Sequence, residues 1–215
     1  MKKKKKLILF DFDGTLLDSD QMIVVTFQQL YALYKKDNIF DLKKVLTFSG
    51  PPIKETLKNE FPDIDQDFIF NEFVRLSTIN YDKYVHLFPY VKEMIDILKK
   101  HNIKVGLITS KARKATMYAL SLCALDNVFD IIVCADDVKK TKPDPEGIYK
   151  ALKSFNIAKD DTLYVGDTNY DYFTSENANI DFGYVSFSPR KLIQDAKNVI
   201  LIHDFESFTK EIINA

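Results

Sequence analysis

Short apolar runs alternate with helical patterns along most of this 215-residue chain. The runs occupy residues 7–10, 105–109, 131–134 and 163–165, and polar residues follow each of them. Helical patterns occupy residues 91–100, 114–122 and 145–155, where Pro145 suits a first helical turn. Strands that are apolar on both faces and alternate with helices predict an α/β fold. We therefore expect a Rossmann-like parallel sheet with helices on both faces.

A helical insertion interrupts this alternation after the first run. Residues 18–84 contain no strand run, and apolar residues recur there at helical spacing, as in residues 22–34. Further helices are expected at 53–61 and 67–84, on either side of a turn at Pro62-Asp63. The pattern predicts a catalytic core made of residues 1–17 and 85–215 with a helical cap at 18–84. Within the core, two more strands at 182–187 and 199–202 and a closing helix at 205–213 are expected.

Charge and cysteine content narrow the class of protein. The 30 basic and 31 acidic residues nearly cancel, so a nucleic-acid partner is not expected. No apolar stretch approaches the ~20 residues of a membrane span, so no membrane partner is expected. Cys123 and Cys134 lack the spacing of a redox or zinc site, which favours a reducing compartment and a cytoplasmic protein. The run Lys2–Lys6 is interpreted as a solvated lead-in to the first strand, with a basic patch as the alternative.

The residues directly after the strand runs are rich in groups for phosphoryl transfer. Asp11 and Asp13 follow the first run, and Thr109 and Ser110 follow the second. The segment Gly166–Asp171 follows the fourth run, with Lys142 upstream of it. Ligands of open parallel sheets bind outside the carboxyl ends of the strands, so we expect these side chains to share one site.

Phosphoryl transfer requires an in-line nucleophile, a proton donor for the leaving oxygen and cations for the phosphoryl oxygens. Asp11 is the predicted nucleophile, which would form an aspartyl phosphate that water then hydrolyses. Asp13 is the predicted general acid and base. Lys142 is predicted to balance the charge of Asp11 and of the phosphoryl group.

A magnesium site is predicted among four carboxylates, those of Asp11, Asp13, Asp167 and Asp171. Their mutual repulsion in one crevice would be costly without a hard divalent cation, and oxygen ligands with phosphate favour Mg²⁺ over zinc. Thr109 and Ser110, with backbone N–H groups at the following helix, are predicted to hold phosphate oxygens.

Each motif also has a simpler structural interpretation. Asp13-Gly14 is a good type I′ hairpin signal, Lys142 before Pro143 could be an ordinary surface loop, and Thr109-Ser110 could be a helix N-cap. The placement of all these motifs at or near predicted strand ends favours the shared site.

These residues resemble the haloacid dehalogenase superfamily, whose four motifs match Asp11-Phe12-Asp13-Gly14-Thr15, Thr109, Lys142 and Gly166–Asp171. The resemblance covers essentially the whole chain and implies the same nucleophile, acid and base, and magnesium site. Asp13 disfavours the dehalogenase branch, which lacks an aspartate there. Asn179 stands where relatives usually have glycine, and asparagine also tolerates a left-handed backbone.

The segments Gly50–Thr56, Asp136–Val138 and Lys142–Glu146 resemble the phosphoglycolate phosphatase and pyrophosphatase branch. The expected function is a magnesium-dependent phosphohydrolase of a small phosphorylated metabolite, most similar to phosphoglycolate phosphatase, with inorganic pyrophosphatase as an alternative. Gly50, Pro51, Pro52 and Lys54 form the candidate specificity loop of the cap.

Two other classes remain open. A sugar-phosphate phosphomutase would share the catalytic residues and need a cationic grip in the cap, for which Lys54 and Arg75 are candidates. A non-enzymatic binding module is the second alternative. The sequence indicates neither the physiological substrate nor the oligomeric state.

Overall fold

The computed structural model describes residues 4–35, 40–48 and 50–215, and these form two compact units. One unit consists of residues 1–16 and 87–215, and the other of residues 17–86. No helix in the described ranges is long and apolar enough to cross a membrane.

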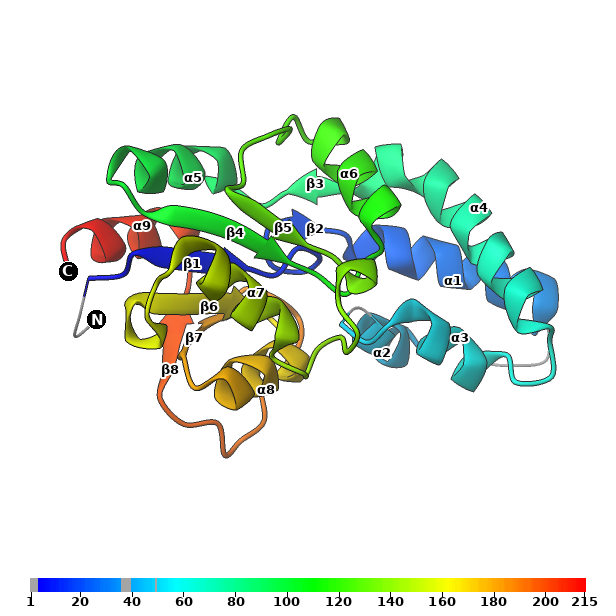
Figure 1. The fold of residues 1–215 in the computed structure, drawn as a ribbon. Helices are drawn as coiled ribbons and strands as arrows, with labels where there is room; N and C mark the ends of the chain where they lie inside the picture. Colours follow the sequence, from blue (N-terminus) through cyan, green and yellow to red (C-terminus); the bar gives the residue numbers. More distant parts are fainter. Residues whose placement is uncertain (1–3, 36–39, 49) are drawn as a thin grey trace. The chain divides into compact units, whose positions relative to one another are not determined.

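The larger unit is built on a six-stranded sheet whose neighbouring strands are parallel (Figure 1). Its order is β5-β4-β1-β6-β7-β8. The strands are β1 (Leu7–Phe10), β4 (Lys104–Ile108), β5 (Ile131–Val133), β6 (Thr162–Gly166), β7 (Asp181–Val185) and β8 (Val199–Ile202). The chain builds outward from β1 to β5, then returns to β6 on the other side of β1. This reversal puts the carboxyl ends of β1 and β6 at the topological switch point, where α/β proteins bind ligands. The expected parallel α/β fold is confirmed.

Helices cover both faces of this sheet, which explains the continuous apolar strand runs. These helices are α5 (Val91–Lys100), α6 (Arg113–Leu122), α7 (Glu146–Phe155), α8 (Asn169–Ala178) and α9 (Phe205–Ile213). Leu7 and Leu9 are fully buried in a cluster that includes Ile148 of α7. Phe10 packs instead on Phe205 of α9, with ring centroids 6.4 Å apart. Strand residues thus alternate between two buried faces.

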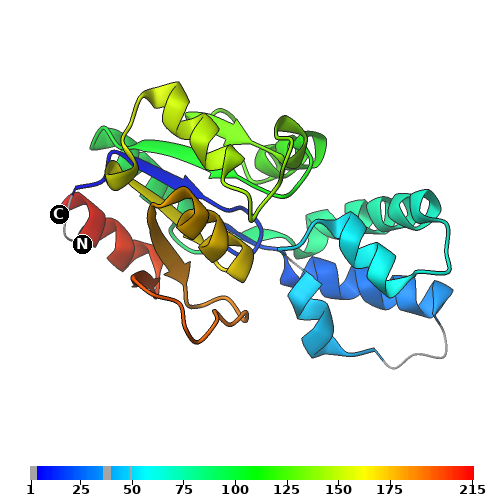
Figure 2. The same ribbon diagram turned by 60° about the horizontal axis from the view of Figure 1, so that its bottom comes forward.

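The smaller unit is helical. It contains α1 (Asp20–Tyr34), α2 (Leu42–Val45), α3 (Ile53–Glu60) and α4 (Gln66–Tyr84), with a 3₁₀ turn at Leu46–Phe48. Helices α1 and α4 lie side by side in both views (Figure 1, Figure 2). Phe27 of α1 stacks against Phe48 and Phe73, at centroid distances of 4.6 and 5.8 Å. The chain enters and leaves this unit through β2 (Leu17–Asp18) and β3 (His86–Leu87), which pair with each other.

Several local predictions need correction. Pro145 is the N-cap of α7 and not a residue of its first turn. Helix α2 was not predicted, because four residues are too few to show helical periodicity. Lys5 does not belong to a solvated lead-in, since it is 2% exposed and its Nζ donates to Asp160 O at 2.8 Å and Asp181 Oδ2 at 2.6 Å. Lys2 and Lys3 lie outside the described residues.

The left-handed backbone expected at Asn179 is confirmed. Asn179 has φ 56° and ψ 55° and ends α8, where its N–H donates to the carbonyl of Glu176. Asparagine therefore supplies the left-handed C-cap, a position where glycine is also common.

Candidate active site

Three buried carboxylates meet at the carboxyl ends of β1 and β6. Asp11 extends the ladder of β1, because its N–H donates to Val165 O of β6 at 2.8 Å. Asp167 follows β6, and Asp171 lies in the first turn of α8. Oxygen atoms of Asp11, Asp167 and Asp171 lie within 4.8 Å of one another, and these residues are 3%, 0% and 0% exposed. Residues 156 positions apart in the chain thus contribute to one acidic cluster.

Lys142 lies between two of these carboxylates. Its Nζ donates to Asp11 Oδ1 and to Asp171 Oδ1, both at 2.7 Å, and its side chain is 4% exposed. A lysine this deeply buried requires paired charges. The surface-loop interpretation of Lys142 is therefore wrong.

Both carboxylate oxygens of Asp171 accept hydrogen bonds. Helix α8 begins with a capping box, in which Thr168 Oγ1 accepts from Asp171 N–H while Asp171 Oδ2 accepts from Thr168 N–H at 3.0 Å. The Tyr164 hydroxyl donates to Asp171 Oδ1 at 2.8 Å, beside the bond from Lys142. A Cβ on Gly166 would lie 2.4 Å from Asp171 Cβ, so glycine permits this close approach.

Asp13 is not part of the acidic cluster. Its carboxylate is paired with Lys111 Nζ at 2.9 and 3.0 Å, and its side chain is 21% exposed. The structure therefore brings together three of the four predicted metal-binding carboxylates. The fourth, that of Asp13, forms an ion pair with Lys111 instead.

Gly14 does not form the alternative hairpin turn after Asp13. Strand β1 pairs only in parallel, with β4 and β6. Gly14 has φ +80°, and a Cβ there would lie 2.3 Å from Asp167 Oδ2. Glycine is required both by its backbone angle and by the Asp167 carboxylate packed against it.

Asp167 accepts hydrogen bonds on both oxygens. Thr15 Oγ1 donates to Oδ1 at 3.1 Å. Ser188 Oγ and Arg190 Nη1 each donate to Oδ2 at 2.8 Å. The Arg190 side chain is 8% exposed, so this ion pair is nearly enclosed.

Thr109 and Ser110 follow β4, as predicted. The Thr109 hydroxyl accepts from Lys111 N–H at 3.1 Å. Helix α6 begins later, at Arg113 with Ala112 as its N-cap, so the helix-cap interpretation of Thr109-Ser110 is wrong. Ser110 Oγ is buried and makes no hydrogen bond with any part of the chain that the structure describes. A buried hydroxyl without a partner is costly unless a ligand supplies one.

Burial and mutual repulsion shift the pKa values of the cluster. Burial, followed by the charge of Asp171, raises the pKa of Asp11 well above its usual range in spite of Lys142. Burial likewise raises the pKa of Asp167 to about 6, although Arg190 opposes the shift. For Asp171 burial acts in the same direction, but Lys142 and the hydrogen bonds outweigh it and lower the pKa. The Lys142 pKa is raised, because its two carboxylates outweigh its burial. When all three carboxylates are ionised they face two cations, and the cluster then has an excess of negative charge.

This donor set fits a hard divalent cation. It offers buried carboxylate oxygens and, within the described residues of the cluster, no sulfur or imidazole. Asp171 accepts two hydrogen bonds on each of its oxygens. From the described residues, Asp11 Oδ2 accepts none and Asp167 Oδ1 accepts one. Asp11 and Asp167 are therefore the better candidates to hold the metal. Asp171 fits a role in positioning Lys142.

The helical unit contains the candidate specificity loop and the two candidate phosphomutase cations. Gly50 has φ +117°, and Pro52 is the N-cap of α3. Lys54 Nζ lies 4.8 Å from the centre of the Phe70 ring. Arg75 donates to both carboxylate oxygens of Glu72 at 2.8 Å.

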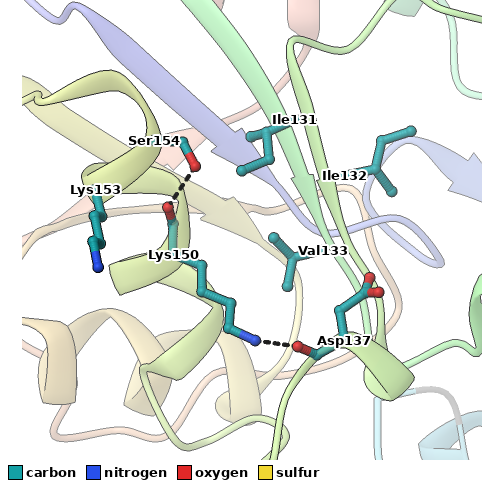
Figure 3. Close-up of a pocket in the computed structure, with 7 residues that line it drawn as sticks. All are labelled: Ile131, Ile132, Val133, Asp137, Lys150, Lys153 and Ser154. Carbon is teal, nitrogen blue, oxygen red and sulfur yellow. Dashed lines mark hydrogen bonds between the residues drawn. The ribbon is translucent and has the colours of Figure 1, made fainter.

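A hollow of about 510 Å³ lies away from the carboxylates, beside the edge strand β5 (Figure 3). It is lined by Ile131, Ile132, Val133, Asp137, Lys150, Lys153 and Ser154. Lys150 Nζ donates there to the carbonyl of Asp137, and Ser154 Oγ donates to the carbonyl of Lys150 at 3.0 Å. The Lys150 contact ties α7 to the segment after β5, whereas the Ser154 contact lies within α7. Neither brings catalytic groups together.

Sequence reasoning missed three residues that contact the cluster. Tyr164 was interpreted as strand core, and its hydroxyl could not be placed without the sheet. Ser188 and Arg190 follow β7, so applying the strand-end rule to the last predicted strands would have found them.

Comparisons with known proteins agree with this geometry. The family model of haloacid dehalogenase-like hydrolases matches residues 8–185. A pyrophosphatase PpaX of Oceanobacillus iheyensis is 30% identical over 208 residues, which cover 92% of this chain and 96% of the relative. Another pyrophosphatase PpaX, from Bacillus cereus, is 32% identical over 188 residues, with coverage of 86% and 85%.

Solved structures share the fold. A candidate haloacid dehalogenase-like hydrolase from Bacteroides fragilis has a TM-score of 0.78 at 29% identity, with coverage of 92% of this chain and 97% of that one. A candidate phosphoglycolate phosphatase from Lactobacillus plantarum has a TM-score of 0.81 at 21% identity, with coverage of 97% and 99%. With the match over residues 8–185 and the acidic cluster at the strand ends, these comparisons establish that the chain belongs to the haloacid dehalogenase-like hydrolases, as an enzyme of their phosphatase type.

Proposed function

We propose that this protein is a magnesium-dependent phosphohydrolase that forms an aspartyl phosphate on Asp11. The observation that carries the proposal is the state of the Asp11 carboxylate. Oδ1 is held by Lys142 at 2.7 Å, whereas Oδ2 accepts no hydrogen bond from the described residues. A fixed carboxylate with one open oxygen is suited to in-line attack on phosphorus.

The first step forms a bond between an Asp11 oxygen and phosphorus and breaks the bond to the leaving oxygen. Asp13 donates a proton to that oxygen. In the second step Asp13 removes a proton from water, whose oxygen attacks phosphorus and releases Asp11 and inorganic phosphate. Asp13 is partly exposed, which suits proton exchange with water. Its ion pair with Lys111 has to loosen for Asp13 to take up the proton that it donates.

The remaining residues stabilise charge. The hydroxyls of Thr109 and Ser110 bind phosphoryl oxygens, which would satisfy the buried Ser110 Oγ. Tyr164 and Asp171 position Lys142 against Asp11. A bound Mg²⁺, held by Asp11 and Asp167, would neutralise phosphoryl oxygens at this edge of the sheet.

Inorganic pyrophosphate is the first substrate to test. The relatives at 30% and 32% identity are named pyrophosphatases, and they support this choice over phosphoglycolate. Phosphoglycolate is the second candidate. Both compounds have a small leaving group that requires few contacts beyond the phosphoryl site. We further propose Gly50, Pro51, Pro52 and Lys54 as a specificity loop, and the cytoplasm as the compartment.

The phosphomutase alternative has less support. Arg75, one of its two candidate cations, is engaged by both oxygens of Glu72. Detection of an isomerised sugar phosphate in place of free phosphate would favour it.

The test is steady-state phosphate release from pyrophosphate, phosphoglycolate, sugar phosphates and nucleotides, with Mg²⁺ or with EDTA. We expect turnover only with the metal. Asp11→Asn should lower kcat by at least about 10⁴-fold, because it removes the nucleophile. Asp13→Asn should lower kcat by about 10²–10⁴-fold.

The matched control is Asp126→Asn, which makes the same chemical change at an exposed position. It should leave kcat unchanged. Persistent turnover in Asp11→Asn would exclude the aspartyl-phosphate mechanism, and no turnover on any substrate with Mg²⁺ would favour the binding module.

A further inference from the structure

Arg190 is a cation at the acidic cluster to which the proposed phosphoryl transfer gives no role. Its Nη1 lies 2.8 Å from Asp167 Oδ2 and 3.1 Å from Ser188 Oγ. The side chain is 8% exposed, and the carboxylate that it contacts is fully buried. Arg190 is thus a built-in cation on a carboxylate that the proposed function assigns to the metal.

Protein donors already contact both oxygens of Asp167 and leave one acceptor position, on Oδ1. Thr15 donates to Oδ1, while Ser188 and Arg190 share Oδ2. A divalent cation that bound Asp167 would lie close to the guanidinium and would be repelled by its charge. The metal and Arg190 therefore compete for the negative charge of the same carboxylate.

The charge count of the cluster supports this competition. With Arg190 in place, the carboxylates of Asp11, Asp167 and Asp171 face the cations of Lys142 and Arg190. Lys142 already bridges Asp11 and Asp171, so Arg190 is the cation that partners Asp167. A divalent cation and Arg190 together would give the cluster an excess of positive charge.

We propose that Arg190 is an internal counter-cation that holds Asp167 in the metal-free enzyme and leaves this carboxylate when a divalent cation binds. Arg190 thereby sets the metal affinity of the enzyme. Its charge keeps the Asp167 carboxylate in position when no metal is bound. The same charge lowers the affinity of the site for the divalent cation. The inference rests on the proposed metal site.

The test is a titration of the full-length protein, first stripped of metal, with Mn²⁺. The electron paramagnetic resonance signal of free Mn²⁺ measures how much of the ion is bound. Arg190→Met keeps much of the apolar stem and removes the charge, and it should bind Mn²⁺ about tenfold more tightly. Lys191→Met is the matched control, because Lys191 is exposed and next to Arg190 in the chain. It should change the Kd less than about twofold, since exposed charges are screened.

A second readout uses the wild-type protein. The chain has three arginines, Arg75, Arg113 and Arg190, so its guanidinium NMR spectrum is simple. Adding Mg²⁺ should shift the Arg190 side-chain signal and leave those of Arg75 and Arg113 unchanged. Arg190→Met assigns the signal by its loss if that variant folds, and Arg190→Lys assigns it otherwise.

An unchanged or weaker Mn²⁺ affinity in Arg190→Met would overturn the role of Arg190 while leaving the metal site intact. The role of Arg190 would also be overturned if the wild-type protein binds Mg²⁺ and its Arg190 side-chain signal does not shift. Absence of Mn²⁺ binding in every variant would overturn the metal site itself, and this inference with it.

Discussion

Each unit contains a group of charged side chains around a buried carboxylate, and the net charges of the two groups have opposite signs. The sheet cluster consists of Asp11, Asp167, Asp171, Lys142 and Arg190. The Glu60 cluster in the helical unit consists of Tyr31, Lys35, Lys44 and Glu60. Both contain a carboxylate that is less than 5% exposed. The balance of charge separates them, and so does the burial of their cations. Lys35 and Lys44 are 27% and 51% exposed, whereas Lys142 and Arg190 are 4% and 8% exposed.

In the Glu60 cluster cations outnumber carboxylates. Lys44 Nζ lies 2.7 Å from Glu60 Oε1, and Lys35 Nζ lies 3.7 Å from Oε2. The Tyr31 hydroxyl donates to the same carboxylate. Burial alone would raise the pKa of Glu60, but the bonds from Lys44 and Tyr31 outweigh it and lower the pKa. This cluster is electrostatically complete without a ligand.

In the sheet cluster carboxylates outnumber cations, and the pKa values of Asp11 and Asp167 are raised. Such a site costs stability in the metal-free protein and recovers it when a cation binds. An excess of one charge in a buried cluster is therefore a better sign of function than burial of charge by itself.

The largest loss of stability is expected when the central cation of the sheet cluster is removed. Lys142→Met leaves Asp11 and Asp171 without their shared cation, and it should lower the free energy of unfolding by about 3–5 kcal/mol at pH 7.5. Urea denaturation measures this loss. Lys150→Met removes a lysine that is 46% exposed and paired with Glu146, and it should cost less than about 1 kcal/mol. A loss below 1 kcal/mol in Lys142→Met would show that the cluster does not depend on its lysine.

The pH dependence of the metal-free protein should differ in sign between the clusters. The folded-state pKa of Asp167, about 6, exceeds its ordinary value of 3.8, so the folded state binds more protons between these values. Its contribution to stability is present below about pH 4 and is lost as pH rises through 6, on the order of 2–3 kcal/mol. Glu60 acts oppositely, because its pKa is lowered, and its contribution is lost as pH falls below the ordinary value of 4.5.

Urea denaturation of the metal-free protein from about pH 3 to pH 7 covers both pH ranges and tests this difference. Asp167→Asn should flatten the decline in stability with rising pH. Glu60→Gln should leave that decline unchanged and remove the loss of stability that Glu60 causes below about pH 4.5. Equal pH slopes in both variants and the wild type would contradict the contrast.

Binding of a divalent cation should stabilise the sheet unit. Mg²⁺ at 100 times its Kd should add about 2.7 kcal/mol to the free energy of unfolding. Asp167→Asn should abolish most of this gain, and Glu60→Gln should retain it. Thermal unfolding with Mg²⁺ and with EDTA gives the comparison. An equal gain in Asp167→Asn would exclude Asp167 as a metal ligand.

The smallest effect is expected at the rim of the Glu60 cluster. Lys44→Met removes a side chain that is 51% exposed and leaves Lys35 and Tyr31 on Glu60. The free energy of unfolding should fall by about 1 kcal/mol or less. A loss as large as that of Lys142→Met would mean that Glu60 also depends on a single cation.

The sequence by itself determined the fold class and most of the acidic cluster. Continuous apolar runs between helical patterns require strands buried on both faces, as the opposite packing of Leu9 and Phe10 shows. The residues after those strands had to meet at one edge, because parallel strands all end there. This argument predicted that Asp11, Lys142 and Asp167 lie together.

Only the tertiary structure decided the partner of each charged group. The sequence grouped Asp13 with the other carboxylates, whereas the fold pairs it with Lys111. It gave no role to Tyr164 or Arg190 and placed Lys5 in solvent. Pairing depends on side-chain positions to within a few tenths of an ångström, between residues that can lie more than 100 positions apart. Periodicity and strand-end position carry no such distance, so these contacts emerge only when the sheet and its loops are packed.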